Sequence, residues 1–94
     1  MKPRKDKYLK ARGGKYAIYN IYCENCDSEL LIYQKDGEGI LKRFYLDRIL
    51  SPVGQSINEA YCGKCGRAFG RPYIYEKESR PAIRLFVGAV YKRK

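Results

Sequence analysis

The four cysteines are the residues of this chain whose type and spacing point most directly to chemistry. They form two C-x-x-C pairs, Cys23 with Cys26 and Cys62 with Cys65. Two residues between ligands allow one tight turn to aim both sulfurs at a single point, and two such turns can face each other around one ion. Four thiolates in a tetrahedron are the ligand set of a structural Zn²⁺. The spacing therefore predicts one zinc ion held by all four cysteines.

The residues beside the cysteines favour such turns. Gly63 and Gly66 can adopt the positive φ that a turn of this kind often needs. Asp27 and Ser28 follow the first pair and offer side-chain oxygens for hydrogen bonds within the turn. We expect both pairs to form knuckle-like turns.

Three other uses of the cysteines are less consistent with the sequence than zinc binding. Two disulfides are typical of small secreted chains, but the first residues contain no apolar signal segment. A redox pair would be a single C-x-x-C in a βαβ setting, which neither pair has. Iron held by four thiolates has the same ligand set, and the spacing leaves it open. Iron electron carriers of that kind are usually acidic, whereas this chain is basic, so we favour zinc.

Length and charge restrict the partners. A chain of 94 residues makes one domain with a thin core, so metal binding is expected to contribute folding free energy. The 20 Lys and Arg residues outnumber the 10 Asp and Glu residues and give a formal net charge of +10, which predicts a polyanionic partner. No apolar run approaches the roughly 18 residues of a membrane helix. We expect a soluble, cytoplasmic protein without a membrane or small-molecule partner.

The first 14 residues read as a basic arm, and residues 15–94 as the folded domain. The arm is too polar to bury much surface, so we expect it to be disordered or extended, with Gly13 and Gly14 as its hinge. Basic arms commonly follow phosphates. A second contact zone is expected from Arg80, Arg84 and the C-terminal Lys92, Arg93 and Lys94. The candidate nucleic-acid contacts are Lys2, Arg4, Lys5, Lys7, Lys10, Arg12, Lys15, Arg71, Arg80, Arg84, Lys92, Arg93 and Lys94.

Runs of β-branched and aromatic residues predict strands throughout the domain. Two glycines in 36–39 predict a hairpin turn between the second and third strands. Residues 40–50 also fit helical spacing, but we favour a strand to Leu46 followed by an irregular segment. Pro72 is expected at the edge or start of its strand. The predicted strands are 16–22, 29–35, 40–46, 57–61, 71–76 and 82–91, with a loop at 51–56.

No residue pattern predicts an enzyme. The chain has no His, and four thiolates leave no open position on a zinc ion. Asp36 and Glu38 are interpreted as solvated turn residues rather than a catalytic pair. Tyr73 and Tyr75 share one strand face with Arg71, which allows either packing or stacking on unpaired bases, and we favour packing.

The four cysteines, with Gly63 and Gly66, resemble the four-cysteine zinc-ribbon superfamily over residues 15–76. The resemblance implies a small β-rich single domain in which antiparallel hairpins are clamped by a Cys₄ zinc site. Between the pairs lie 35 residues, longer than the roughly 15 to 20 of the compact pattern, so additional strands are expected.

Zinc ribbons occur in ribosomal proteins, RNA polymerase subunits and transcription factors, and this short basic chain is most similar to archaeal-type ribosomal members. That resemblance implies a structural constituent of the ribosome that contacts structured RNA, rRNA above all, and neighbouring ribosomal proteins. The alternative is a zinc-ribbon transcription factor or RNA polymerase-associated protein. On that alternative, the turn at 36–39 would be inserted into a partner's channel.

Overall fold

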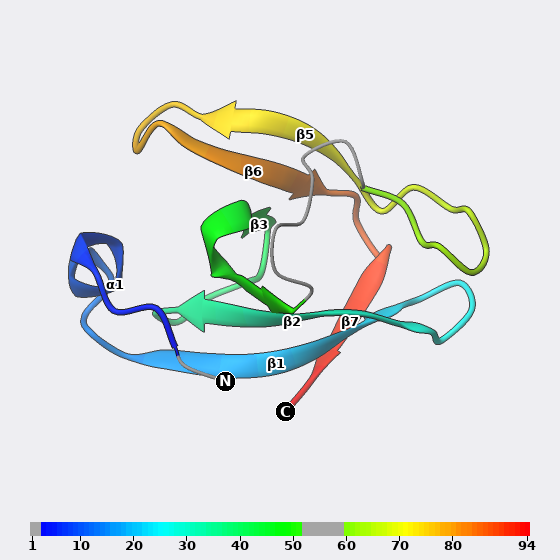
Figure 1. Ribbon diagram of the computed structural model, residues 1–94, viewed down its shortest axis with the longest axis horizontal. Coiled ribbons are helices and arrows are strands. Elements are labelled where there is room, and N and C mark those ends of the chain that lie inside the picture. Colours follow the sequence, from blue (N-terminus) through cyan, green and yellow to red (C-terminus); the bar gives the residue numbers. More distant parts are fainter. Residues whose placement is uncertain (1–2, 52–59) are drawn as a thin grey trace.

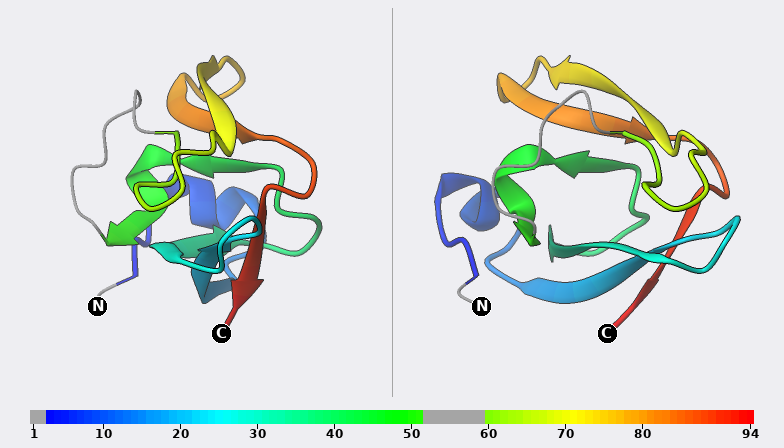
Figure 2. Two further views of the ribbon diagram at one scale, coloured as in Figure 1. Left: turned by 90° about the vertical axis from the view of Figure 1, so that its right-hand side faces the viewer. Right: turned by 45° about the vertical axis from the view of Figure 1, so that its right-hand side comes forward.

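The chain folds into two antiparallel β-sheets, as seen in a computed structural model that describes residues 3–51 and 60–94. The larger sheet has the strand order β4-β2-β1-β7, and the smaller sheet has the order β3-β6-β5. Figures 1 and 2 show the two sheets as two layers, with β1 and β2 in one layer and β5 and β6 in the other. The elements in chain order are α1 (Lys7–Ala11), β1 (Tyr16–Cys23), β2 (Glu29–Asp36), β3 (Arg43–Tyr45), a 3₁₀ turn (Leu46–Arg48), β4 (Ile49–Ser51), β5 (Gly70–Tyr75), β6 (Arg80–Leu85) and β7 (Val90–Arg93).

Strand alternation decides which side chains of the larger sheet reach the core. In β2, Leu31 and Tyr33 are buried, since residues two apart point to the same face. Ile21 of β1 lies opposite Leu31 and is fully buried. The predicted strands over residues 16–22 and 29–35 are thus confirmed, each with one further residue at its end.

Aromatic side chains fill the space between the two sheets. Phe44 of β3 pairs with Ile83 of β6, and both are fully buried. The ring of Tyr33 lies against Phe44, with 4.9 Å between ring centroids, and Phe69 meets Phe44 edge-on. Because β2 supplies Tyr33 and the smaller sheet supplies Phe44, this cluster joins the two layers.

The described part of the N-terminal segment contains a short helix where an extended or disordered arm was expected. Asp6 caps α1, because its carboxylate accepts hydrogen bonds from the backbone N–H groups of Tyr8 and Leu9. Leu9 is buried, and the Asp6 carboxylate is 2.6 Å from a guanidinium nitrogen of Arg48. The one acid and the one leucine of this basic segment therefore hold it against the sheets. The division into residues 1–14 and 15–94 stays a prediction.

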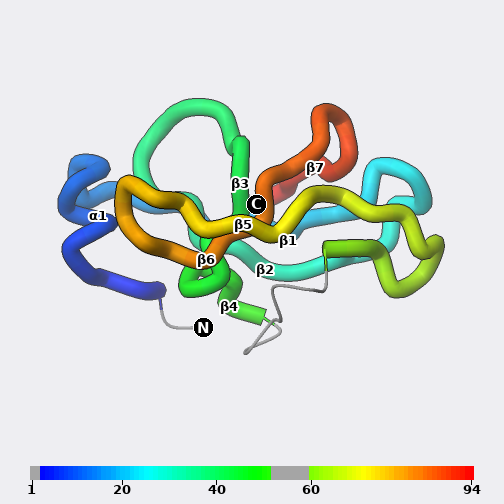
Figure 3. Tube along the Cα trace, turned by 90° about the horizontal axis from the view of Figure 1, so that it is seen from above, coloured from blue at the N-terminus to red at the C-terminus, as the bar shows by residue number. Residues whose placement is uncertain are grey.

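The predicted hairpin between the second and third strands is wrong. After β2 the chain bends over residues 37–42 and enters β3, which pairs with β6 of the smaller sheet (Figure 3). The hydroxyl of Tyr33 accepts a hydrogen bond of 2.9 Å from the backbone N–H of Tyr45. A side chain of β2 thus reaches the backbone of β3, although the two strands belong to different sheets. Instead, β4 becomes the neighbour of β2, after the 3₁₀ turn in the segment expected to be irregular.

The predicted last strand, residues 82–91, is two strands in different sheets. β6 ends at Leu85, and the chain turns through Gly88, whose φ is +70°. β7 then pairs with β1 of the larger sheet. Strand propensity is high throughout this run, so only the backbone conformation at the turn reveals the break.

Two smaller expectations can be compared with the described residues. Pro72 lies in β5, an edge strand, as predicted, since an edge position does not require its missing N–H group. The predicted loop at 51–56 and the strand at 57–61 fall largely on residues 52–59, outside the described residues. Within residues 3–51 and 60–94, no helix has the length and apolar character needed to cross a membrane.

Candidate metal centre and basic surface

The two cysteine turns have the same backbone hydrogen bonds. Around the first pair, the N–H of Cys23 donates to the carbonyl of Ser28, and the N–H of Asp27 donates to the carbonyl of Cys23, both at 2.8 Å. Around the second pair, Cys62 and Arg67 repeat the first bond, while Gly66 and Cys62 repeat the second, again at 2.8 Å. The two C-x-x-C segments are thus repeated knuckles, as their spacing predicts.

The two knuckles face each other and bring all four sulfurs together. The Sγ atoms of Cys23, Cys26, Cys62 and Cys65 all lie within 4.8 Å of one another. Across the knuckles, Sγ of Cys23 is 3.8 Å from that of Cys65, and Sγ of Cys26 is 3.6 Å from that of Cys62. A tetrahedron with Zn–S bonds near 2.3 Å has sulfurs about 3.8 Å apart. The cluster therefore fits one tetrahedral metal ion, and zinc matches its ligand chemistry.

A positive φ is needed at the same position of each knuckle, one residue after the second cysteine. Gly66 has φ +78° there, as expected for a residue without a Cβ. In the first knuckle Asp27 occupies this position with φ +61°, one of two non-glycine residues with positive φ among those described. Gly63 does not have a positive φ, so the prediction holds for Gly66 alone.

The environments of the sulfurs differ between buried and exposed ligands. Cys23 and Cys62 are buried, whereas Cys26 and Cys65 are exposed. Burial raises the pKa of the Cys23 thiol to about 11. A hydrogen bond from the Asn25 side chain, supported by the backbone of Arg67, lowers the pKa of Cys65 to about 6. A bound Zn²⁺ deprotonates coordinating thiols outright, so metal binding would overcome the raised pKa of Cys23.

β7 supports the first knuckle, which the sequence did not predict. Val90 pairs with Cys23, and the N–H of Glu24 donates to the carbonyl of Ala89 at 3.0 Å. The Tyr91 hydroxyl is 2.8 Å from a carboxylate oxygen of Asp27. The same contact with Asp27 raises the pKa of Tyr91. The second knuckle has no equivalent strand among the described residues. Instead, Tyr61 and Ala68 form one isolated backbone bridge across it.

Comparison with protein-family models, curated proteins and solved structures finds no match to this chain. The assignment of a metal centre therefore rests on the geometry of the four cysteines. It is a four-cysteine cluster in a small β-rich domain, consistent with a zinc-ribbon-like site.

Two of the predicted phosphate-binding arginines form ion pairs with carboxylates of the protein itself. Arg80 is only 2% exposed, and its guanidinium pairs with Asp47 at 2.6 Å and with Glu78 at 3.0 Å. Its guanidinium also lies 3.7 Å from the centroid of the Tyr45 ring. Arg12 is half-buried and pairs with Glu78 at 2.9 Å. The prediction of a phosphate contact is therefore wrong for Arg80, whose side chain is buried, and the Arg12 guanidinium is already paired with Glu78.

The other predicted contacts form separate exposed groups. Lys15 lies near the C-terminal Lys92 and Lys94. All three line one surface hollow of about 370 Å³. The register of β5 and β6 sets Arg71 opposite Arg84. Lys2 lies outside the described residues. The remaining exposed members are Arg4, Lys5, Lys7, Lys10 and Arg93.

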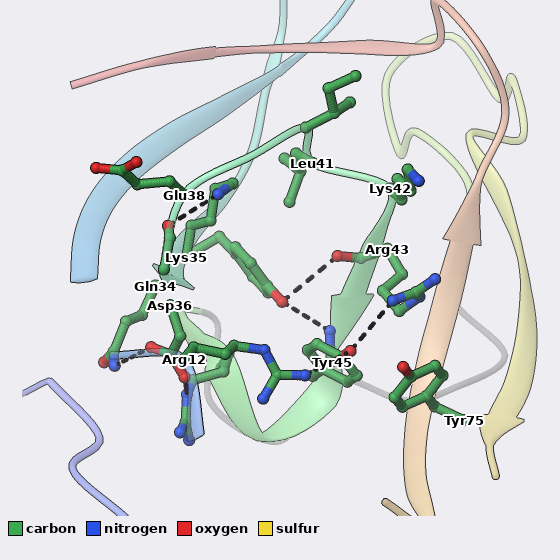
Figure 4. A pocket seen from close by; sticks show the side chains of 14 residues that line it. Arg12, Gln34, Lys35, Asp36, Glu38, Leu41, Lys42, Arg43, Tyr45 and Tyr75 are labelled. Carbon is green, nitrogen blue, oxygen red and sulfur yellow. Dashed lines mark hydrogen bonds and ion pairs between the residues drawn. The ribbon is translucent and has the colours of Figure 1, made fainter. Parts of the chain in front are cut away.

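The two carboxylates of the predicted turn have different environments. Asp36 is only 5% exposed at its side chain and pairs with Nε of Arg48 at 2.7 Å. Arg48 is fully buried and also pairs with Asp6. Glu38 is exposed. Figure 4 shows the hollow beside them, of about 420 Å³, where these acids lie near Arg12 and Lys35. The prediction of two solvated turn residues is thus right for Glu38 and wrong for Asp36.

Proposed function

We propose that this protein is a non-enzymatic zinc-binding protein of the cytoplasm that contacts structured RNA mainly through phosphates, as a constituent of the ribosome. The zinc ion would have a structural role, because four thiolates complete its coordination shell and leave no position for substrate. The RNA contact would come from the exposed basic groups on both sheets and on α1.

RNA binding is supported by which basic residues form ion pairs with the carboxylates. Among the described residues, four acidic residues form ion pairs with three arginines, Arg12, Arg48 and Arg80, none of which is exposed. The exposed lysines and arginines of the described residues therefore have no carboxylate partner in an ion pair, and they present the positive charge of the chain to the solvent. A surface of that kind favours a polyanion. The pairs join Arg12 to Glu78, Arg48 to Asp6 and Asp36, and Arg80 to Asp47 and Glu78.

The alternative function, a zinc-ribbon transcription factor, required a projecting acidic hairpin tip. The described residues form no hairpin at 36–39, and Asp36 is buried in an ion pair. Only Glu38 is left exposed there, so no specific feature of this structure favours that alternative over RNA binding.

Sedimentation of a gently prepared lysate on a sucrose gradient at rising salt tests the proposal. We expect the tagged protein to sediment near-stoichiometrically with one ribosomal subunit and to stay bound at moderate salt. Sedimentation with RNA polymerase would favour the alternative. Migration at the top of the gradient, even in low salt, would contradict both functions.

The contribution of the N-terminal segment can be tested without undocking α1. Deleting residues 1–12 would also remove Asp6 and Leu9, which hold the segment in place. Replacing the exposed Lys5 and Lys10 with Gln leaves those contacts intact. If both contact phosphates, the slope of log K against log salt on a structured RNA should fall by about 2 units.

A matched control uses the same change of charge elsewhere. Lys64 and Lys77 are exposed and lie outside the predicted contacts. The double variant Lys64→Gln and Lys77→Gln should keep the wild-type slope. Equal slopes for the two double variants would show that the N-terminal lysines touch no phosphates.

A further inference from the structure

One face of the smaller sheet carries arginine and tyrosine in rows. Residues two apart on a strand point to the same face, so Arg71, Tyr73 and Tyr75 of β5 share it. The register sets Arg71 opposite Arg84 of β6, and Arg84 opposite Arg43 of β3. Three arginines that lie far apart in the sequence therefore form one row across the sheet.

The next row places a small residue between two aromatic ones. Ala82 of β6 lies between Tyr73 on one side and Tyr45 on the other. Tyr45 is buried, and Tyr75 meets it edge-on with 5.6 Å between ring centroids. Arg43 lies over the Tyr75 ring at 4.5 Å and beside Tyr45 (Figure 4). Tyr45 and Tyr75 are thus already packed against protein groups.

Tyr73 is different, because its ring has no stacking partner among the residues that the structure describes. It is half-buried and lines a groove of about 630 Å³ together with Tyr75, Arg43 and Arg84. The walls of the groove come from two connections, residues 40–42 and 86–88, whose apolar side chains are those of Ile40, Leu41, Phe86 and Val87. Figure 3 shows these connections rising on the same side of the molecule, on either side of β3.

The charge of the groove has one sign. Its lining includes Lys42, Arg43 and Arg84 and no acidic residue. Within residues 3–51 and 60–94, no carboxylate forms an ion pair with Arg43, Arg84 or the neighbouring Arg71. The hollow of Figure 4 differs, because its lining includes Asp36 and Glu38.

We propose that this groove binds one unpaired nucleotide of RNA, with the base stacked on Tyr73 and the phosphate held by Arg84. Unpaired bases expose a ring face that stacks on aromatic side chains, whereas bases within a duplex do not. The apolar walls would cover the base, and Arg71 would lie beside the adjoining phosphate. This inference rests on the proposed RNA-binding function and adds a preference for unpaired over fully paired RNA.

The test compares two RNA hairpins with the same stem, using the full-length, zinc-loaded protein. One hairpin carries a single bulged 2-aminopurine, and the other is fully paired. We expect about tenfold tighter binding of the bulged hairpin, together with quenching of 2-aminopurine fluorescence when the base stacks. Tyr73→Leu should abolish both effects, and Tyr73→Phe should retain them because the ring remains.

Matched variants separate stacking from charge and from folding. Tyr16→Leu removes a 40% exposed tyrosine from the larger sheet and should leave the preference unchanged. Arg84→Gln, at an exposed position, should weaken binding of the bulged hairpin about threefold at low salt, while Lys77→Gln should not. Equal affinity for the two hairpins without quenching would overturn this inference alone. Binding to neither hairpin would overturn the proposed function as well.

Discussion

The two ends of the molecule join distant segments of the chain by different chemistry. At one end, residues 23–26 and 62–65 form two loops on the same side of the molecule (Figure 1). Their four sulfurs lie within 4.8 Å of one another. At the other end, α1 and Asp6 are joined to residues 36–48 and 78–80 by ion pairs of buried and half-buried arginines. The metal end has ligands that a short spacing rule identifies. The arginine end has no such rule, because each of its pairs depends on the tertiary fold.

The difference also concerns how each end would fail. Removing a metal ion removes four strong bonds at once, and its binding free energy is largely folding free energy. An ion pair must offset the desolvation of its own charges, so the loss of one partner is costly mainly because the other charge stays buried. The following experiments compare the two ends, from the largest expected effect to the smallest.

Removal of the metal should have the largest effect on folding. Zinc in small structural sites contributes on the order of 10 kcal/mol to folding. We therefore expect a strong chelator at neutral pH, or Cys62→Ser, to abolish the cooperative unfolding transition measured by calorimetry. Metal analysis should find one zinc ion per chain. Identical melting with and without chelator would contradict the site, and a coloured protein would identify iron.

Replacement of Arg48 should be the largest effect at the arginine end. Arg48→Met leaves the buried Asp36 carboxylate without a counter-charge and should reduce the free energy of unfolding by about 3 to 5 kcal/mol. Urea denaturation of the zinc-loaded protein measures this change. The double variant Arg48→Met with Asp36→Asn should recover part of the loss. Arg93→Met, at an exposed position, should stay within about 0.5 kcal/mol of wild type.

A glycine comparison tests the backbone of the second knuckle. Gly66→Ala should cost about 1 kcal/mol, because its φ of +78° disfavours a side chain although no atom lies within 4 Å of the added Cβ. Gly63→Ala provides the control, since Gly63 has the same open space without a positive φ. Chemical denaturation of both variants measures the difference. Equal stability of the two would mean that the left-handed conformation at Gly66 carries no cost.

The pH dependence of Asp6 gives the smallest effect. Its hydrogen bond from Arg48 lowers the pKa of this carboxyl to about 2, below the ordinary value of 3.8. The folded-state pKa is thus depressed, so the contribution to stability is fully present above about pH 4 and is lost as the pH falls toward 2. Because the Asp6 side chain is 40% exposed, this contribution should stay below about 1 kcal/mol.

The titration of the Asp6 carboxyl carbon by NMR measures this directly. We expect a midpoint near 2 in the wild-type protein, where Arg48 lies beside the carboxyl. A midpoint close to the ordinary value would show that Asp6 and Arg48 do not pair in solution.

The sequence was sufficient to predict features that depend on neighbouring residues. The C-x-x-C spacing identified all four members of the sulfur cluster, because two ligands separated by two residues already share one turn. Runs of β-branched and aromatic residues identified β1 and β2, since such side chains pack well on the surface of a pleated sheet. These signals are contained within about ten residues of chain.

Tertiary structure alone decided which strands pair and which charges are exposed. The run from residue 82 to 91 has one continuous strand propensity, yet β6 and β7 belong to different sheets. Arg80 and Arg84 are four residues apart on β6 with the same side-chain chemistry. One is buried against Asp47, whereas the other is exposed beside the groove. Nothing local distinguishes them, because burial and ion pairing depend on partners brought together from distant segments of the chain.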